Sequence, residues 1–156
     1  MTLPDLEFKW LSFDAFDAFS LYETLRFRQD IFIVEQNSAY PDLDGLDPVC
    51  AHLLVRNGAG RLAGYLRARG PDGTAPAFIG RIVIAPDWRG TGLGQRLVAA
   101  GMAHLAQHHP GAPICIGAQQ HLIRFYARFG FVVDGAPYDD GGIPHVTMWQ
   151  GRTDVP

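Results

Sequence analysis

The stretch that decides the fold reads Ile79-Gly80-Arg81-Ile82-Val83-Ile84, followed by Arg89-Gly90-Thr91-Gly92-Leu93-Gly94. The first segment is apolar and rich in β-branched residues, which is typical of a buried strand. Apolar residues then recur at helical spacing until His109-Pro110-Gly111, so the order is strand, glycine-rich turn, helix. The first N–H groups of a helix have no partner inside it, and the helix dipole adds about half a positive charge there. The turn therefore predicts a site for a phosphate or pyrophosphate.

The glycine pattern is short, and a chain with 18 glycines can produce it by chance. A glycine-rich turn without a ligand is the alternative. The position of the turn between a strand and an amphipathic helix favours the anion site.

Length and composition favour a single domain over residues 1–156, because the chain is too short for two ordinary cores. A net charge of −3 lacks the basic excess of nucleic-acid binders, so no nucleic-acid partner is expected. The chain has no apolar stretch of membrane-spanning length and no secretory signal pattern, which predicts a cytoplasmic protein without a membrane partner. Cys50 and Cys115 lie far apart and have no metal-ligand spacing, so no metal is expected.

Apolar patterning and turn residues divide the chain into strands and helices. Strands are expected at residues 8–11, 52–56, 61–67, 77–85, 114–118, 131–133 and 143–149. A capping box at Ser20-Leu21-Tyr22-Glu23 predicts a helix that continues to about Phe32, and further helices are expected after Gly92 and at residues 121–129. The strand–helix–strand crossover implies parallel pairing and the hairpins antiparallel pairing. The result is an α/β (α+β) fold with a mixed sheet of about six to seven strands and about four helices.

Two motifs resemble those of the GNAT (GCN5-related N-acetyltransferase) superfamily. Arg89-x-x-Gly92-x-Gly94 after Ile82-Val83-Ile84 is similar to the loop that binds the pyrophosphate of acetyl-CoA. Gln119, Phe125-Tyr126 and Phe129-Gly130-Phe131 are similar to the second motif, where Asn or Gln opens a helix whose Tyr faces the thioester.

A closer resemblance is to the ElaA-like subgroup. It runs through Arg26-x-Arg28-x-x-Ile31-Phe32-x-Val34-Glu35-Gln36, Tyr40-x-Asp42-x-Asp44-Gly45-x-Asp47, Gly117-Ala118-Gln119 with His121, and Asp140-Gly141-Gly142-Ile143-Pro144-His145. In the last of these, Asp140 and Gly141 stand where the subgroup more often has a Glu-Asp-Gly run.

The resemblance implies a parallel strand pair that is splayed at the CoA site. The backbone of the strand is expected to pair with pantetheine like an added strand, and the amides of the glycine-rich turn to bind the pyrophosphate. The implied donor-binding residues are Ile82, Val83, Ile84, Arg89, Gly90, Thr91, Gly92, Leu93, Gly94, Gln95, Gln119 and Tyr126.

For catalysis, the resemblance implies that an amide near Val83 polarises the thioester carbonyl and that the Tyr126 hydroxyl protonates or hydrogen-bonds the sulfur. A core aromatic is the alternative for Tyr126. The attacking amine must be neutral although its pKa is ~10.4, so a base or water chain is needed. Candidates for the base are Glu35, His52, His121 and His145, each with a structural role as its alternative. Acceptor binding is expected at Glu35, Gln36, His121 and His145.

Asp42, Asp44 and Asp47 form an acidic loop that allows two readings. The carboxylates either attract a cationic acceptor or satisfy amides of a solvated turn.

The function expected from these features is acetyl-CoA-dependent N-acetyl transfer to a primary amine of a small molecule, by direct attack in a ternary complex. A protein or peptide acceptor and a non-catalytic CoA-binding module are the alternatives. The carboxy-terminal strand pair offers an edge through which a homodimer can form.

Overall fold

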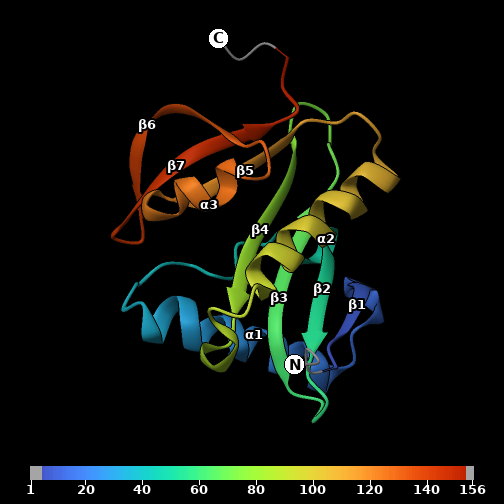
Figure 1. The fold of residues 1–156 in the computed structure, drawn as a ribbon. Coiled ribbons are helices and arrows are strands. Elements are labelled where there is room, and N and C mark those ends of the chain that lie inside the picture. The colour runs from blue at the N-terminus through green and yellow to red at the C-terminus, as the bar shows by residue number, and fades with distance from the viewer. Residues whose placement is uncertain (1–4, 154–156) are drawn as a thin grey trace.

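The structure, a computed structural model, describes residues 5–153 and contains one seven-stranded mixed sheet (Figure 1). The strand order is β1-β2-β3-β4-β5-β7-β6, and every neighbouring pair is antiparallel except β4–β5. The strands are β1 (Glu7–Ser12), β2 (Ala51–Arg56), β3 (Leu62–Arg69), β4 (Ala77–Ile84), β5 (Ile114–Gln119), β6 (Val132–Asp140) and β7 (Ile143–Gln150). The α-helices of the described residues are α1 (Ala18–Gln29), α2 (Leu93–His108) and α3 (Ile123–Ala127). The predicted mixed α/β sheet is confirmed.

The parallel pair is short. Only Ala77–Ile114 and Phe78–Cys115 are paired, at the start of both strands. From Ile79 to Ile84, β4 is paired with β3 alone. The sheet therefore consists of two halves, β1–β4 and β5–β7, which diverge beyond their first contact.

Two apolar cores lie on opposite faces of the sheet, because neighbouring residues of a strand point to opposite sides. The larger core joins Leu53 and Leu66 to the buried face of α2, which crosses the sheet in the view of Figure 1. A Cβ at Gly101 of α2 would lie 3.0 Å from Ile79 Cδ1, so the glycine permits close packing of helix on strand. The smaller core joins Leu54 and Tyr65 to residues after α1.

Helix α1 begins earlier than the sequence predicted. The Asp17 side chain accepts the Ser20 N–H at 2.7 Å, and Ser20 Oγ accepts the Asp17 N–H at 3.2 Å. This is a capping box with Asp17 as the N-cap and Ser20 as its third helical residue, whereas the prediction took Ser20 as the N-cap. The helix continues as a π-helix over Asp30–Glu35 and ends at Gln36.

The carboxylates of the acidic loop bind buried arginines, which neither sequence reading included, and Asp44 Oδ1 also accepts the Leu46 N–H at 3.1 Å, in line with the reading as a local turn. Arg28, which has no exposed surface, pairs through Nε with Asp42 Oδ2 at 3.0 Å and through Nη1 with Asp47 Oδ1 at 2.8 Å. Arg67 pairs with Asp47 at 2.9 Å and with Asp44 at 2.5 Å. Burial alone would raise the pKa of Asp44, but the hydrogen bonds from Arg67 outweigh it and hold that pKa well below its usual range.

Arg81 completes this Arg–Asp network, whose members are Arg28, Arg67, Arg81, Asp42, Asp44 and Asp47. Its Nε lies 2.8 Å from Asp42 Oδ1, and its Nη2 donates to the Asp42 carbonyl at 3.0 Å. The network joins α1, β3 and β4 to the loop at residues 38–47, and its three positive and three negative charges cancel.

Candidate active site

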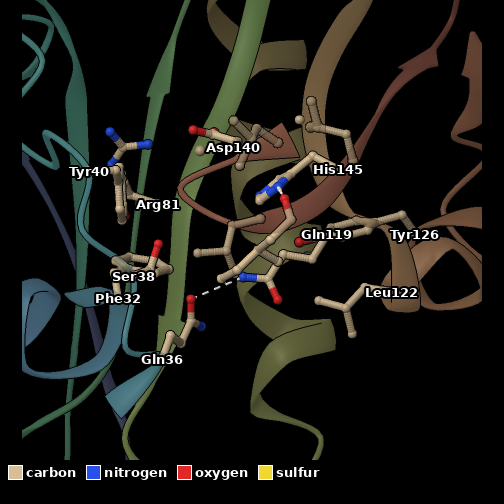
Figure 2. A pocket seen from close by; sticks show the side chains of 16 residues that line it. Phe32, Gln36, Ser38, Tyr40, Arg81, Gln119, Leu122, Tyr126, Asp140 and His145 are labelled. Carbon is tan, nitrogen blue, oxygen red and sulfur yellow. Dashed lines mark hydrogen bonds between the residues drawn. The ribbon is translucent and has the colours of Figure 1, made fainter. Parts of the chain in front are cut away.

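A pocket opens where β4 and β5 diverge, and it encloses about 830 Å³ including its open mouth. In Figure 2, Gln36, Ser38 and Tyr40 lie on one side of the pocket, and Gln119, Tyr126 and His145 lie on the other. Residues 79–82 of β4 and the β6–β7 hairpin also line it, as do Phe32, Ile116, Gly117 and Leu122. The pocket thus collects side chains from both halves of the sheet.

A β-bulge shapes the β4 wall of this pocket. Tyr65 pairs with Val83 and Arg67 with Gly80, so two residues of β4, Arg81 and Ile82, lie opposite a single residue of β3. Arg81 has a φ of +51°, in the left-handed region that non-glycine residues rarely adopt. A β-bulge leaves backbone N–H and C=O groups unpaired in the hydrogen-bond ladder between the strands, and it bends the bulged strand. Arg81 and Ile82 line the pocket, whereas Val83, near which the polarising amide was expected, is buried against the smaller core.

Tyr126 lies in α3 and lines the pocket, although only 7% of it is exposed. Burial raises the pKa of its hydroxyl to about 12. At neutral pH the hydroxyl therefore keeps its proton and can donate it to a partner in the pocket. Its ring also packs edge-on against Phe125 and Phe131, so Tyr126 both lines the pocket and packs in the core.

His145 is held in a defined tautomer on β7. Its Nδ1 lies 2.7 Å from the Ile143 carbonyl oxygen, which can only accept, so Nδ1 carries the hydrogen (Figure 2). In the neutral ring, Nε2 then keeps its lone pair and can accept a proton. The ring stacks on Tyr138, its cross-strand partner on β6, with centroids 5.9 Å apart.

Two hydrogen bonds across the pocket connect the segment after the π-helix to the β5–β7 half of the sheet. Gln119 Nε2 donates to Gln36 Oε1 at 3.2 Å, which links the end of β5 to the residue after the π-helix (Figure 2). Ser38 Oγ donates to the Gly141 carbonyl at 2.5 Å and ties the loop to the β6–β7 hairpin. Gln36 and Gln119, which stand in two separate segments of the ElaA-like sequence pattern, are thus in direct contact.

The glycine-rich turn has the geometry of an anion site. Gly90 and Gly92 have φ values of +74° and +86°, and a Cβ on either would enter space that no other group occupies within 4 Å. Gly92 is the N-cap of the 16-residue α2, and no side chain caps this end. The first-turn amides are therefore available to a phosphate, which fits the implied donor.

Arg89 and Glu35 differ from their expected roles. The Arg89 N–H donates to the Pro86 carbonyl at 3.3 Å, so this amide is already engaged. The Arg89 guanidinium pairs with Glu35 at 2.6 Å, and its hydrogen bond lowers the pKa of that carboxyl. Glu35 is exposed and lies outside the pocket lining. A carboxylate that binds an arginine and does not face the pocket is a poor base, so Glu35 is not retained as one.

His52 and His121 also lie outside the pocket lining. His121 is exposed in a short turn before α3. His52 is 2% exposed, and its Nε2 lies 2.9 Å from the Asp47 carbonyl, which makes Nε2 the donor. Its Nδ1 lies 2.6 Å from Tyr65 Oη and accepts from that hydroxyl. Both nitrogens are engaged and the ring lies outside the pocket lining, so His52 is not carried into the proposed mechanism as a base.

The buried His52 should make stability depend on pH. Burial lowers its pKa from 6.5, so the unfolded chain takes up a proton more readily than the fold does. The stabilisation is complete above the unfolded value and is lost as the pH falls below it. We expect the free energy of unfolding, measured with urea, to fall between about pH 7.5 and about pH 5.5. His52→Gln should flatten this dependence, and the same change at exposed His108 should not; equal slopes in all three proteins would contradict the assignment.

Sequence reasoning missed part of the lining. Ser38 and Tyr40 belong to a loop whose path is set by ion pairs to distant arginines, and no local pattern reveals that path. Arg81 could have been recognised from the sequence as a candidate site residue, because an arginine is unusual in the middle of an apolar strand.

Within residues 5–153, no group of three His, Cys, Asp or Glu side chains is arranged to hold a metal ion. No helix in this range is both long and apolar enough to cross a membrane.

Comparison with known proteins identifies the family. Residues 49–150 match the acetyltransferase (GNAT) domain model. The chain therefore belongs to the GNAT superfamily and is an acyltransferase that uses acyl-CoA.

Within this superfamily the chain belongs to the ElaA-like subgroup. It is 34% identical to Protein ElaA of Escherichia coli over 146 residues, which cover 92% of this chain and 95% of ElaA. The crystal structure of that ElaA superimposes with a TM-score of 0.87 and covers 94% of this chain and 99% of the other. An acyl-CoA N-acyltransferase from Pseudomonas aeruginosa has a TM-score of 0.88 at 32% identity, with the same coverage. A UPF0039 protein of Synechocystis is 37% identical over 92% of this chain and 94% of its own length.

Proposed function

We propose that the protein transfers an acetyl group from acetyl-CoA to a primary amine of a small molecule, and that Tyr126 and His145 perform the proton transfers. The observation that carries the proposal is the presence of both side chains in one pocket, the first as a proton donor and the second with a free Nε2. The pocket also adjoins the unpaired edge of β4.

The donor would lie along the gap between β4 and β5. The edge of β4 from Ile79 to Ile84 that faces β5 has no strand partner among residues 5–153, so an extended arm can pair with it in the manner of an added strand. The amides at the start of α2 would hold the pyrophosphate, with Gly90 and Gly92 leaving room for its oxygens. The bulge at Arg81 and Ile82 supplies backbone groups beside the pocket, where a thioester carbonyl needs a donor.

Acetyl-CoA supplies an activated acyl group: the C–N bond to the amine forms as the C–S bond breaks, and an amide and a thiol result. His145 Nε2 accepts the proton that the amine must lose. The Tyr126 hydroxyl donates to the departing sulfur, and its proton is restored from His145 through solvent. Cys115 pairs with Trp149 and does not line the pocket, so direct attack without a covalent enzyme intermediate is the simplest course.

Tyr126→Phe tests the proposal. An amine screen that follows CoA release identifies an acceptor, and kcat and the acetyl-CoA Kd are then measured for the variant. Loss of one donor to developing charge should lower kcat by about 10²-fold while Kd changes by less than about twofold. His145→Gln should also lower kcat. Its loss of kcat relative to the wild-type protein should be smaller at about pH 9 than at neutral pH, because more of the amine is already neutral there.

Tyr22→Phe serves as the matched control, since Tyr22 is 71% exposed on α1 and should keep full activity. An equal loss of kcat and of acetyl-CoA affinity in Tyr126→Phe would assign Tyr126 to packing. Acetyl-CoA binding without CoA release for any small amine, peptide or protein would indicate a non-catalytic CoA-binding module.

A further inference from the structure

The charges of the groups that line the pocket do not sum to zero. Arg81, Asp140 and His145 are the ionisable residues of the lining besides its tyrosines. Arg81 belongs to the Arg–Asp network, whose six charges balance, and pairs with Asp42 at 2.8 Å. No ion pair or hydrogen bond joins the Asp140 side chain to another group within residues 5–153. The pocket therefore keeps one uncompensated negative charge, on the carboxylate of Asp140.

Asp140 stands at a defined position relative to the proposed base. It is the last residue of β6 and lies two residues beyond Tyr138, whose ring stacks on His145. Because Tyr138 is the cross-strand partner of His145, Asp140 is the diagonal neighbour of His145 on the same face of the sheet, about 7–8 Å away. Asp140 is exposed and lines the pocket, which places it at the mouth, and in the view of Figure 2 its side chain lies between those of Arg81 and His145. A molecule whose amine reaches His145 would bring its next few atoms past this carboxylate.

We infer that the acceptor is a dication, a linear diamine or a longer amine with a second positive charge, and that Asp140 binds the charge that does not react. The inference rests on the proposed function, because His145 marks where the reacting nitrogen lies. A carboxylate at the mouth attracts such an amine, favours it over a neutral one and repels an amine that carries a carboxylate. A separation of about 7–8 Å between the diagonal positions of His145 and Asp140 fits a chain of several methylenes.

Three probes of equal chain length and different charge test this inference: putrescine, butylamine and γ-aminobutyrate. Binding to the CoA-saturated protein is measured by calorimetry, and transfer by CoA release from acetyl-CoA. Putrescine should bind at least about tenfold more tightly than butylamine, and γ-aminobutyrate more weakly than both. The advantage of putrescine should shrink as salt is added.

Asp140→Asn keeps the size of the side chain and removes its charge, so the ratio of putrescine to butylamine affinity should fall to near one. Asp139→Asn is the matched control. Asp139 adjoins Asp140 but points to the other face of β6, and its Oδ1 accepts the Gly142 N–H, which asparagine can still do. The control should keep the full ratio.

A ratio near one in the wild-type protein overturns the inference, and so does a ratio that survives Asp140→Asn. If transfer nevertheless occurs, the proposed function stands. If putrescine binds through Asp140 but no amine releases CoA, the proposed function fails and the cation site stands.

Discussion

Gly92→Glu is expected to weaken binding of acetyl-CoA by about a thousandfold or more, which corresponds to about 4 kcal/mol. Two effects act together. The new carboxylate enters the open space in front of the α2 amides, where it repels the pyrophosphate and takes up its hydrogen bonds, each worth about 1.5–3 kcal/mol to a charged group. The φ of +86° also strains any residue with a Cβ. Calorimetric titration with acetyl-CoA measures the effect.

Gly73→Glu separates the anion site from general strain. Gly73 also has a positive φ, +56°, and open space around its Cβ position, but it lies in the loop before β4, at the opposite end of that strand from the turn at residues 89–94. The Gly73→Glu variant should lose about as much stability as Gly92→Glu but keep its affinity for acetyl-CoA. Unchanged affinity in Gly92→Glu would remove the turn at residues 89–94 from the donor site.

Arg28→Met should destabilise the fold by about 3–5 kcal/mol, the usual result of breaking a buried ion pair from one side. The guanidinium of Arg28 bonds the Asp42 carboxylate, the Asp42 carbonyl and the Asp47 carboxylate, and all of these are buried. Methionine fills much of the volume but leaves the two carboxylates with fewer partners. Urea denaturation followed by circular dichroism gives the change in the free energy of unfolding.

Arg26→Met is the control for this experiment, on the same helix and two residues away. The Arg26 side chain is 70% exposed and lies 3.7 Å from Asp30, so its pair is screened by water and its loss should cost about 0.5 kcal/mol or less. Arg28→Lys should recover little, because an ammonium cannot reproduce the fork of the guanidinium. A loss below about 1 kcal/mol in Arg28→Met would show that the network is not a major source of stability.

The fold was predictable because its signals are local. Alternating and apolar runs mark the strands, Asn57-Gly58 marks the β2–β3 turn, and the crossover through α2 requires β4 and β5 to be parallel. The error at the start of α1 has a local cause as well. Asp17 and Ser20 are both good capping residues, and only the path of the preceding chain selects between them.

The candidate site was predictable only in part, because its polar residues depend on partners far away in the sequence. Tyr126 and Gln119 follow from a motif, whereas nothing near His52 reveals that Tyr65 and the Asp47 carbonyl occupy both of its nitrogens. Arg28 looks like a helix-surface residue, and its burial follows from Asp42 and Asp47, 14 and 19 residues away.

The short contact between β4 and β5 has a consequence for the lifetime of the protein. With two residue pairs joining β4 to β5, β4 from Ile79 to Ile84 is left with one neighbouring strand, and we expect local opening at this gap. A donor bound in the gap, as proposed above, would bind the closed form alone and stabilise it by about 2.7 kcal/mol at a hundredfold excess over its Kd. Resistance to proteolysis would then rise and fall with the supply of acyl-CoA, and the abundance of the enzyme would follow the metabolic state that provides its donor.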